Sequence, residues 1–147
     1  MPDQSDPVSP DEWILRRVPY NELNKLIDPD ITPPISSTAF RPTKNDNDGV
    51  SVFRELFATP DEVANLYMQQ NPGKKCYVIR VKAEAILEPG LGITLTPDPI
   101  IELPGHALIP ELNTERYFTL DKNWCKEVQS KISIPLTIQN IVHWPNI

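Results

Sequence analysis

The chain has 147 residues, of which 39% are hydrophobic and 23% charged, and 17 are proline against only 5 glycine. This length suits one domain with its own core, and the proline content excludes long helices, a coiled coil and a collagen repeat. The 14 basic and 20 acidic side chains give a net charge of -6, and the basic residues are scattered. Because nucleic-acid binders concentrate positive charge, general nucleic-acid binding is disfavoured.

The sequence shows neither a membrane-spanning stretch, nor a secretory signal, nor a clear disulfide pattern. No stretch reaches the roughly 18 apolar residues that would span a membrane, and the polar, proline-rich first ten residues differ from a secretory signal. Cys76 and Cys125 lie far apart and are interpreted as ordinary thiols. We therefore expect a cytoplasmic protein without membrane contact, with residues 1–10 as a flexible lead and residues 11–147 as a single domain.

The first half of the domain is predicted as short strands broken by prolines. Residues 13–18 predict a strand, and residues 19–27 a short helix that ends at Asp28-Pro29. Residues 35–40 and 50–54 predict two strands that pair as a hairpin, because the turn between them ends in Asp48-Gly49.

The clearest helix start is Thr59, which is followed by proline and then by Glu62 at capping-box spacing. This helix is expected to end at residues 71–73. Residues 76–87 predict a central strand in which Tyr77, Ile79 and Val81 face one way.

The remaining elements are shorter. Residues 88–105 predict short extended pieces cut by prolines, and residues 106–109 another strand. An apolar stripe between Leu120 and Ile132 predicts a helix capped by Thr119 or Asp121, before a last strand at 138–144. The fold class expected is α+β: one compact domain with a small mixed or antiparallel sheet, two to three short helices and long proline-rich connections.

The sequence lacks the motifs of several common nucleotide-binding, hydrolase and metal sites. The sequence contains no phosphate-binding loop, no dinucleotide fingerprint and no nucleophile elbow. His106, His143 and the two cysteines are not spaced as zinc ligands. We therefore expect neither a bound cofactor nor a metal ion.

Polar groups that could form a binding site are concentrated around the predicted hairpin: Arg16, Arg17, Ser36, Ser37, Arg41, Ser51 and Arg54. Guanidinium forks suit carboxylate or phosphate, so these residues could hold an anionic ligand or an acidic partner segment. In the alternative, which we favour, the arginines pair with carboxylates of the chain itself. His106 is likewise expected to be a hydrogen-bonded structural residue rather than a catalytic one.

Four segments resemble a set of small bacterial proteins without an established activity. The segments follow in the order Leu15-Arg16-Arg17-Val18-Pro19, Ser36-Ser37-Thr38-Ala39-Phe40-Arg41-Pro42-Thr43, Asp48-Gly49-Val50-Ser51-Val52 and Pro104-Gly105-His106-Ala107. The resemblance covers residues 13–110. It implies a bacterial origin and highlights Arg17, Ser37, Phe40, Ser51 and His106, but it implies no mechanism.

A second set of residues resembles the ADP-ribosyltransferase superfamily. Those enzymes bind and activate NAD with an Arg or His on a first strand, a Ser-Thr-Ser-like segment on a second, and a Glu on a later strand. Arg16 or Arg17, then Ser36-Ser37-Thr38, then Glu102 or Glu111 occur in this order. The chain departs from the pattern because it has no Glu-x-Glu or Gln-x-Glu pair.

Two functions remain open. The first, which we favour, is a non-enzymatic protein-interaction or regulatory module of a bacterial operon-encoded complex, with residues 88–110 as the partner surface. The alternative is a small enzyme or toxin that binds an anionic or nucleotide ligand through the Arg/Ser pocket, most concretely an NAD-using transferase. Whether the chain forms homo-oligomers is left open.

Overall fold

The computed structural model describes residues 3–87, 92–99 and 103–146. Its six strands form one antiparallel sheet in the order β4-β5-β2-β1-β3-β6. The strands are β1 (Trp13–Pro19), β2 (Val50–Arg54), β3 (Cys76–Lys82), β4 (Thr96–Pro97), β5 (His106–Ile109) and β6 (Ile141–His143). The α-helices are α1 (Pro60–Gln70), α2 (Ala83–Leu87) and α3 (Lys122–Ser133). Shorter helical turns are η1 (Ser37–Phe40), η2 (Arg116–Leu120) and η3 (Ile138–Asn140).

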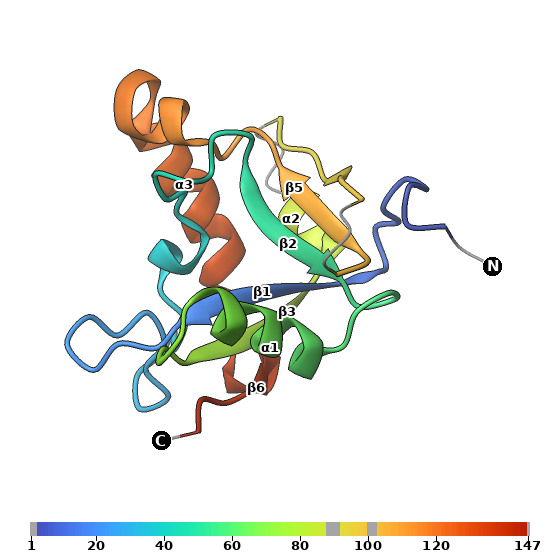
Figure 1. Cartoon of the computed structure of the whole chain (residues 1–147). Coiled ribbons are helices and arrows are strands. Elements are labelled where there is room, and N and C mark those ends of the chain that lie inside the picture. Colours follow the sequence, from blue (N-terminus) through green and yellow to red (C-terminus); the bar gives the residue numbers. More distant parts are fainter. Residues whose placement is uncertain (1–2, 88–91, 100–102, 147) are drawn as a thin grey trace.

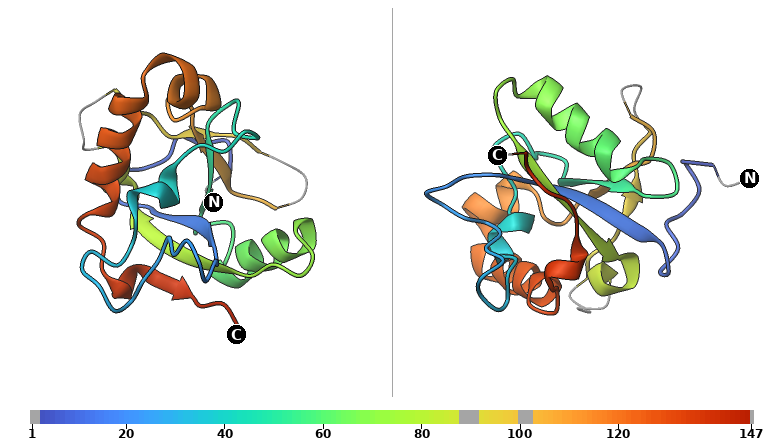
Figure 2. Two further views of the ribbon diagram at one scale, coloured as in Figure 1. Left: turned by 90° about the vertical axis from the view of Figure 1, so that its left-hand side faces the viewer. Right: turned by 90° about the horizontal axis from the view of Figure 1, so that it is seen from below.

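The two faces of the sheet carry separate apolar clusters. On one face Leu15, Phe53 and Val78 pack against α1. On the other face Ile14, Val52 and Ile79 join the larger cluster, which includes apolar residues of η1 and α3. Figure 1 shows α1 lying across β1 and β3, and the two turned views show α3 on the opposite side of the sheet (Figure 2). The expected α+β class with an antiparallel sheet is confirmed.

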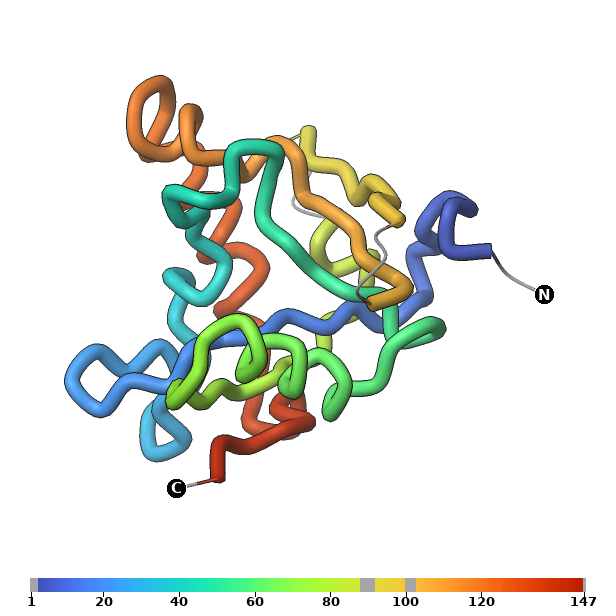
Figure 3. Tube along the Cα trace, viewed as in Figure 1, coloured from blue at the N-terminus to red at the C-terminus, as the bar shows by residue number. Residues whose placement is uncertain are grey.

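The sheet is split between β1 and β2. β1 pairs with β3 from Trp13 to Pro19, but with β2 only through Ile14↔Arg54 and Leu15↔Phe53. Beyond these pairs β2 leaves β1 and runs beside β5, as the chain trace shows (Figure 3). The split separates the two strands at Arg16 and Ser51.

The N-terminal segment is tied to the domain by Arg54. Its Nε and Nη2 donate to the two carboxylate oxygens of Glu12 at 2.9 and 2.8 Å, and Nη1 donates to the carbonyl oxygens of Gln4 and Asp6. Both partners of the ion pair are almost fully buried. Arg54 therefore closes the end of β2 against the segment that precedes β1.

Two predicted helices are confirmed, each with its predicted cap. Thr59 and Glu62 form both hydrogen bonds of the capping box of α1. The side chain of Asp121 accepts a hydrogen bond from the Trp124 amide at the start of α3. Tyr77, Ile79 and Val81 point to the same cluster, as the alternation indicated.

Other element predictions are wrong. Residues 19–27 form no helix, because the Asn21 side chain accepts from the amides of Leu23 and Asn24 and holds an irregular turn. Residues 37–40 are the helical turn η1 rather than a strand, and β2 pairs with β1 and β5, so the predicted hairpin does not form.

Two strands are shorter than predicted. The strand from residue 76 ends at Lys82 and continues as α2, and the last segment divides into η3 and β6. Of the predicted extended pieces between residues 88 and 105, β4 is present, while residues 88–91 and 100–102 lie outside the described ranges. In the described part of the chain, no helix has the length and apolar character needed to cross a membrane.

Candidate functional site

A pocket of about 640 Å³ borders β1 at Arg16 and Arg17, where β1 no longer pairs with β2. Its walls come from β1, the turn after β1, η1 and the connection to β2, and the end of α1. The lining residues are Arg16, Arg17, Pro19, Asn21, Asn24, Leu26, Thr38, Ala39, Arg41, Thr43, Lys44, Asn45, Asp46, Tyr67, Gln70 and Asn71. Four of these side chains are cationic and one is a carboxylate, so the pocket is strongly positive in a chain whose net charge is negative.

Arg16 forms the inner wall of the pocket. Its side chain lies on the same face of β1 as Ile14 and Val18, and the residue is 7% exposed. Nε donates to the carbonyl oxygen of Ala39 at 3.1 Å, and Nη1 donates to that of Ser51 at 2.8 Å. Burial lowers the pKa of the Arg16 guanidinium to about 10, against a weaker opposing effect of Asp46. The side chain therefore remains charged at neutral pH.

Three further cations reach the pocket from different elements. Arg17 lies on the α1 side of β1, with its guanidinium carbon 5.9 Å from the centroid of the Tyr67 ring. Arg41 lies at the same distance from the Tyr117 ring, and both Arg41 and Lys44 are exposed to solvent. The four cations thus approach one space from β1 and from the connection between η1 and β2.

These cations have no acidic partner within ion-pair distance in the described ranges, where arginines and lysines pair only as Glu12–Arg54, Glu55–Arg80 and Glu127–Lys131. Asp46 lines the pocket, but its carboxylate accepts from the amide and hydroxyl of Thr43. The expectation that the arginines pair with carboxylates of the chain therefore holds for Arg54 and does not hold for Arg16, Arg17 or Arg41. The pocket therefore presents three guanidinium groups that have no carboxylate partner among the described residues.

The predicted serines are divided among different places. Ser36 accepts from the Thr38 amide and caps η1, and the carbonyl oxygen of Ser37 accepts from Gln129 of α3. Neither serine lines the pocket. Arg54 is likewise absent from the lining, because it is buried against Glu12.

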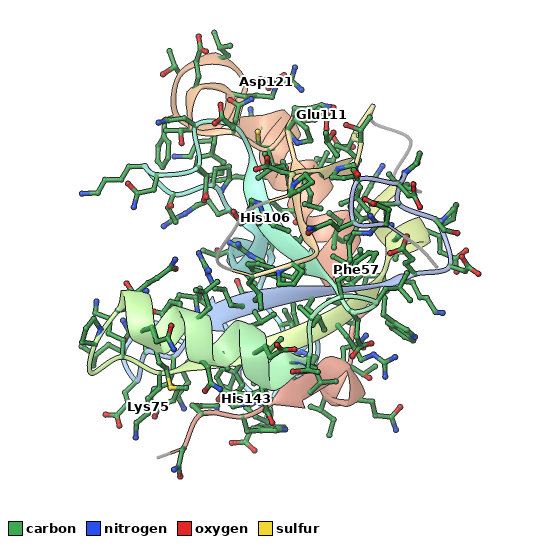
Figure 4. The ribbon with its side chains drawn as sticks, turned by 45° about the vertical axis from the view of Figure 1, so that its right-hand side comes forward. Phe57, Lys75, His106, Glu111, Asp121 and His143 are labelled. Carbon is green, nitrogen blue, oxygen red and sulfur yellow. The ribbon has the colours of Figure 1, made fainter. Side chains whose placement is uncertain are left out.

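Ser51 and His106 are brought together on neighbouring strands, on the face that also carries Phe53. His106 Nε2 lies 3.0 Å from Ser51 Oγ, and Nδ1 lies 3.1 Å from the carbonyl oxygen and 3.2 Å from Oδ2 of Asp98. His106 is therefore hydrogen-bonded, as expected. Figure 4 shows it between the upper strands and α1, whereas Glu111 lies farther up and His143 lies below.

The glutamates implied by the ADP-ribosyltransferase resemblance do not lie with this group. Glu111 accepts from the amide and the hydroxyl of Thr94. Glu102 lies outside the described residues. On β5, the strand that neighbours β2, the polar side chain beside Ser51 is His106.

Several site residues were missed by the sequence analysis, among them Lys44, Tyr67 and Asp98. Lys44 falls within the turn predicted before residue 50 and Tyr67 within the helix predicted after Thr59, and neither was assigned to a site. Asp98 comes close to His106 only because β4 pairs with β5. A local sequence pattern carries no signal for such long-range approaches.

Comparison with known proteins adds no further constraint: no family model, curated protein or solved structure matches the chain. Within the described ranges, no group of three or more His, Cys, Asp or Glu side chains is placed to hold a metal ion.

Proposed function

We propose that the chain binds a phosphorylated or nucleotide ligand in the pocket lined by β1, η1, the connection after η1 and the end of α1. The observation that carries this proposal is the approach of Arg16, Arg17 and Arg41 to one space without a carboxylate at ion-pair distance among the described residues. Guanidinium groups donate paired hydrogen bonds in a geometry that matches phosphate oxygens. A bound phosphate would supply the missing negative charge.

The burial of Arg16 gives this proposal an energetic reason. Moving a charged group out of water is unfavourable unless a partner compensates, and its two carbonyl acceptors carry only partial charges. Other cations close by add repulsion, since Arg17 also lowers the pKa of Arg16. An anion in the pocket would reduce both unfavourable contributions, so the free protein is poised to bind one.

The size and lining of the pocket suit more than a single phosphate. Its 640 Å³ falls within the range of about 300–1,000 Å³ typical of small-molecule sites. Tyr67 offers an aromatic surface, and Asn21, Asn24 and Asn71 offer amide donors and acceptors. These groups could recognise the uncharged part of a nucleotide.

The resemblance to ADP-ribosyltransferases suggests NAD as the first nucleotide to test. It implies an arginine at Arg16 or Arg17, a Ser-Thr-Ser-like segment at Ser36-Ser37-Thr38 and a glutamate at Glu102 or Glu111. Arg16, Arg17 and Thr38 line the pocket, whereas Glu111 accepts hydrogen bonds from Thr94. The described lining of the pocket contains no glutamate, so NAD binding is better supported than ADP-ribosyl transfer.

A thermal-unfolding screen tests this proposal. The probes are NAD, ADP-ribose, ADP and inorganic phosphate, with adenosine and nicotinamide as uncharged controls. A ligand at 100 times its dissociation constant stabilises the fold by about 2.7 kcal/mol, which corresponds to a rise of about 5–10 °C in the midpoint for a chain of this size. We expect phosphorylated probes to raise the midpoint and the controls to leave it unchanged.

Two variants locate the binding. Arg17→Ala and Arg41→Ala should each reduce the ligand-induced shift by more than half. Arg116→Ala is the matched control for Arg41, because Arg116 also stacks on an aromatic ring, at 4.4 Å from Trp124, but lies outside the pocket. No shift with millimolar phosphorylated probes, or equal shifts in all three variants, would contradict the proposal.

A second candidate function is the protein-interaction module of a bacterial operon-encoded complex. It is supported by exposed apolar side chains on and near η2, where Phe118 is 55% and Leu120 is 67% exposed. The edge strand β4 has only two residues, one of them Pro97, so it offers little backbone for strand addition. Sedimentation velocity with and without the products of neighbouring genes tests this function, and association that Leu120→Asp leaves unchanged would place the partner elsewhere.

A further inference from the structure

Ser51, His106 and Asp98 lie close together, outside the residues that line the pocket, and the proposed binding function does not use them. His106 Nε2 is hydrogen-bonded to Ser51 Oγ at 3.0 Å, while Nδ1 is hydrogen-bonded to the backbone carbonyl oxygen of Asp98 at 3.1 Å and lies 3.2 Å from its carboxylate Oδ2. A hydroxyl, an imidazole and a carboxylate in this order are the components of a serine nucleophile with its base and its orienting group.

The hydrogen-bond partners define which nitrogen of the imidazole carries the proton. Both groups near Nδ1, the carbonyl oxygen and the carboxylate of Asp98, can only accept hydrogen bonds. Nδ1 of the neutral ring therefore carries the proton, and Nε2 is left with a lone pair. The Ser51 hydroxyl must then donate to Nε2, which is the direction in which a base removes the proton from a nucleophile.

The relay is fixed by its surroundings. The His106 ring packs against Phe53 with 5.3 Å between centroids, and the Asp98 amide donates to the His106 carbonyl oxygen at 2.9 Å. Gly105 has a φ of +87°, and a Cβ there would lie 2.9 Å from the Cβ of Phe57. This glycine lets β5 begin close to the end of β2, and so places His106 beside Ser51.

The charges around Ser51 favour a reaction in which negative charge develops. The Ser51 carbonyl oxygen accepts from Arg16, and the Arg17 side chain lies on the same face of the sheet as the Ser51 side chain, the face against which α1 packs. Ser51 is partly exposed, and α1 covers β1 and β3 rather than β2 (Figure 1). Positive groups placed near an attacked carbonyl stabilise its developing oxyanion.

We propose that Ser51 is a nucleophile, activated by His106 and oriented through Asp98, that cleaves carboxylic esters of phosphorylated compounds. Ser51 Oγ attacks the ester carbonyl carbon while its proton moves to His106 Nε2. The bond from that carbon to the alcohol oxygen then breaks, and the imidazolium returns the proton to the departing alcohol. Water hydrolyses the acyl-serine by the same proton path, which releases the acid and restores Ser51.

The phosphorylated part of the substrate rests on the proposed binding function, whereas the nucleophile does not. Asp98 is a positioning residue here, because it acts on the reacting atoms only through His106. The test therefore uses a fluorophosphonate probe, which reports an activated serine without requiring the pocket to bind a phosphate.

The intact chain is incubated with the fluorophosphonate, and labelling is measured by mass spectrometry with mapping of the modified residue. We expect a single adduct on Ser51, at a rate at least 10 times that of any other serine. Ser51→Ala should abolish this adduct and His106→Gln should slow it at least 10-fold, while Ser37→Ala, a partly exposed serine without a histidine partner, should leave it unchanged.

The Asp98→Asn variant tests whether Asp98 orients the His106 ring or only stabilises the fold. It should slow labelling, because the imidazole then lacks the carboxylate 3.2 Å from Nδ1, and Asp98→Glu should restore part of the rate. Unlabelled Ser51 in the wild-type chain, or equal labelling in a folded His106→Gln variant, would overturn the proposal. If His106→Gln does not fold, the wild-type mapping alone decides. If the fluorophosphonate labels Ser51 but no phosphorylated probe raises the unfolding midpoint, the proposed binding function is contradicted. The proposal that Ser51 is a nucleophile would still stand.

Discussion

The Nη1 of Arg16 donates a 2.8 Å hydrogen bond to the carbonyl oxygen of Ser51 across the split between β1 and β2. At this point the two strands have stopped pairing, so β1 supplies a side chain in place of a backbone partner. The same guanidinium lines the pocket, and the same serine contacts His106. This hydrogen bond therefore connects Arg16, a residue of the proposed anion site, with Ser51, the proposed nucleophile, at the position where the two strands separate.

The Arg16→Met variant should show that Arg16 contributes more to ligand binding than to the free energy of unfolding. The change leaves two buried carbonyl oxygens without their donor, which is unfavourable, but it also removes a buried charge. Because these effects oppose each other, we expect the free energy of unfolding in urea to change by less than about 2 kcal/mol. Nucleotide-induced stabilisation should disappear. Loss of stability without loss of binding would show that Arg16 serves the fold alone.

The ion pair between Arg54 and Glu12 should be far more important for stability than the one between Arg80 and Glu55. The first pair is almost fully buried and the second is about one-third exposed. We expect Arg54→Ala to lower the free energy of unfolding by about 3–5 kcal/mol, and Glu55→Ala by less than about 1 kcal/mol. Limited proteolysis should also cut the first ten residues faster in Arg54→Ala. Equal effects of the two variants on stability would contradict this assignment.

Gly49 should tolerate no side chain at the start of β2. Its φ is +127°, and a Cβ would lie 2.5 Å from the carbonyl oxygen of Ile109. Gly49→Ala should therefore lower the free energy of unfolding by more than about 2 kcal/mol. Gly73→Ala is the control, because its φ is +81° but no atom lies within 4 Å of the added Cβ. It should cost about 1 kcal/mol in the same urea titration.

We expect the buried thiol of Cys76 to lower the free energy of unfolding at alkaline pH. Burial raises the pKa of its thiol to about 11 from 9.0, partly offset by Arg17. Between these two values the folded chain holds a proton that the unfolded chain has lost, so stability falls as the pH rises through this window. Cys76→Val should reduce the fall by about 1–2 kcal/mol between pH 9 and 11. Identical slopes for variant and wild type in urea titrations would exclude this contribution.

Local sequence patterns predicted the elements that local hydrogen bonds determine. The Thr59 capping box and the Asp121 cap were both read correctly, because each involves residues three positions apart. Ser36 was misassigned because its hydroxyl bonds to the Thr38 amide and starts a helical turn, in a segment whose composition also suits a strand. Short segments of this kind are decided by packing, here against α3 through the bond from Gln129 to Ser37.

The site was only partly predictable for the same reason. Arg16, Arg17, Arg41, Ser51 and His106 were identified from residue type and order. The sequence could not show that Arg54 pairs with Glu12, or that Asp98 reaches His106 through the pairing of β4 and β5. Nor could it show the split between β1 and β2, since a strand carries no local signal for where its pairing ends.

The central claim is that the arginines at this split bind a phosphorylated ligand. Side-chain ¹H–¹⁵N NMR spectra of the arginine Nε–H groups test it most directly, with ADP titrated into the ¹⁵N-labelled chain. We predict saturable shifts of the Arg16, Arg17 and Arg41 resonances, with Arg54 and Arg116 unchanged as internal controls. Resonances of the three pocket arginines that stay unchanged at millimolar ADP and millimolar NAD would contradict the claim.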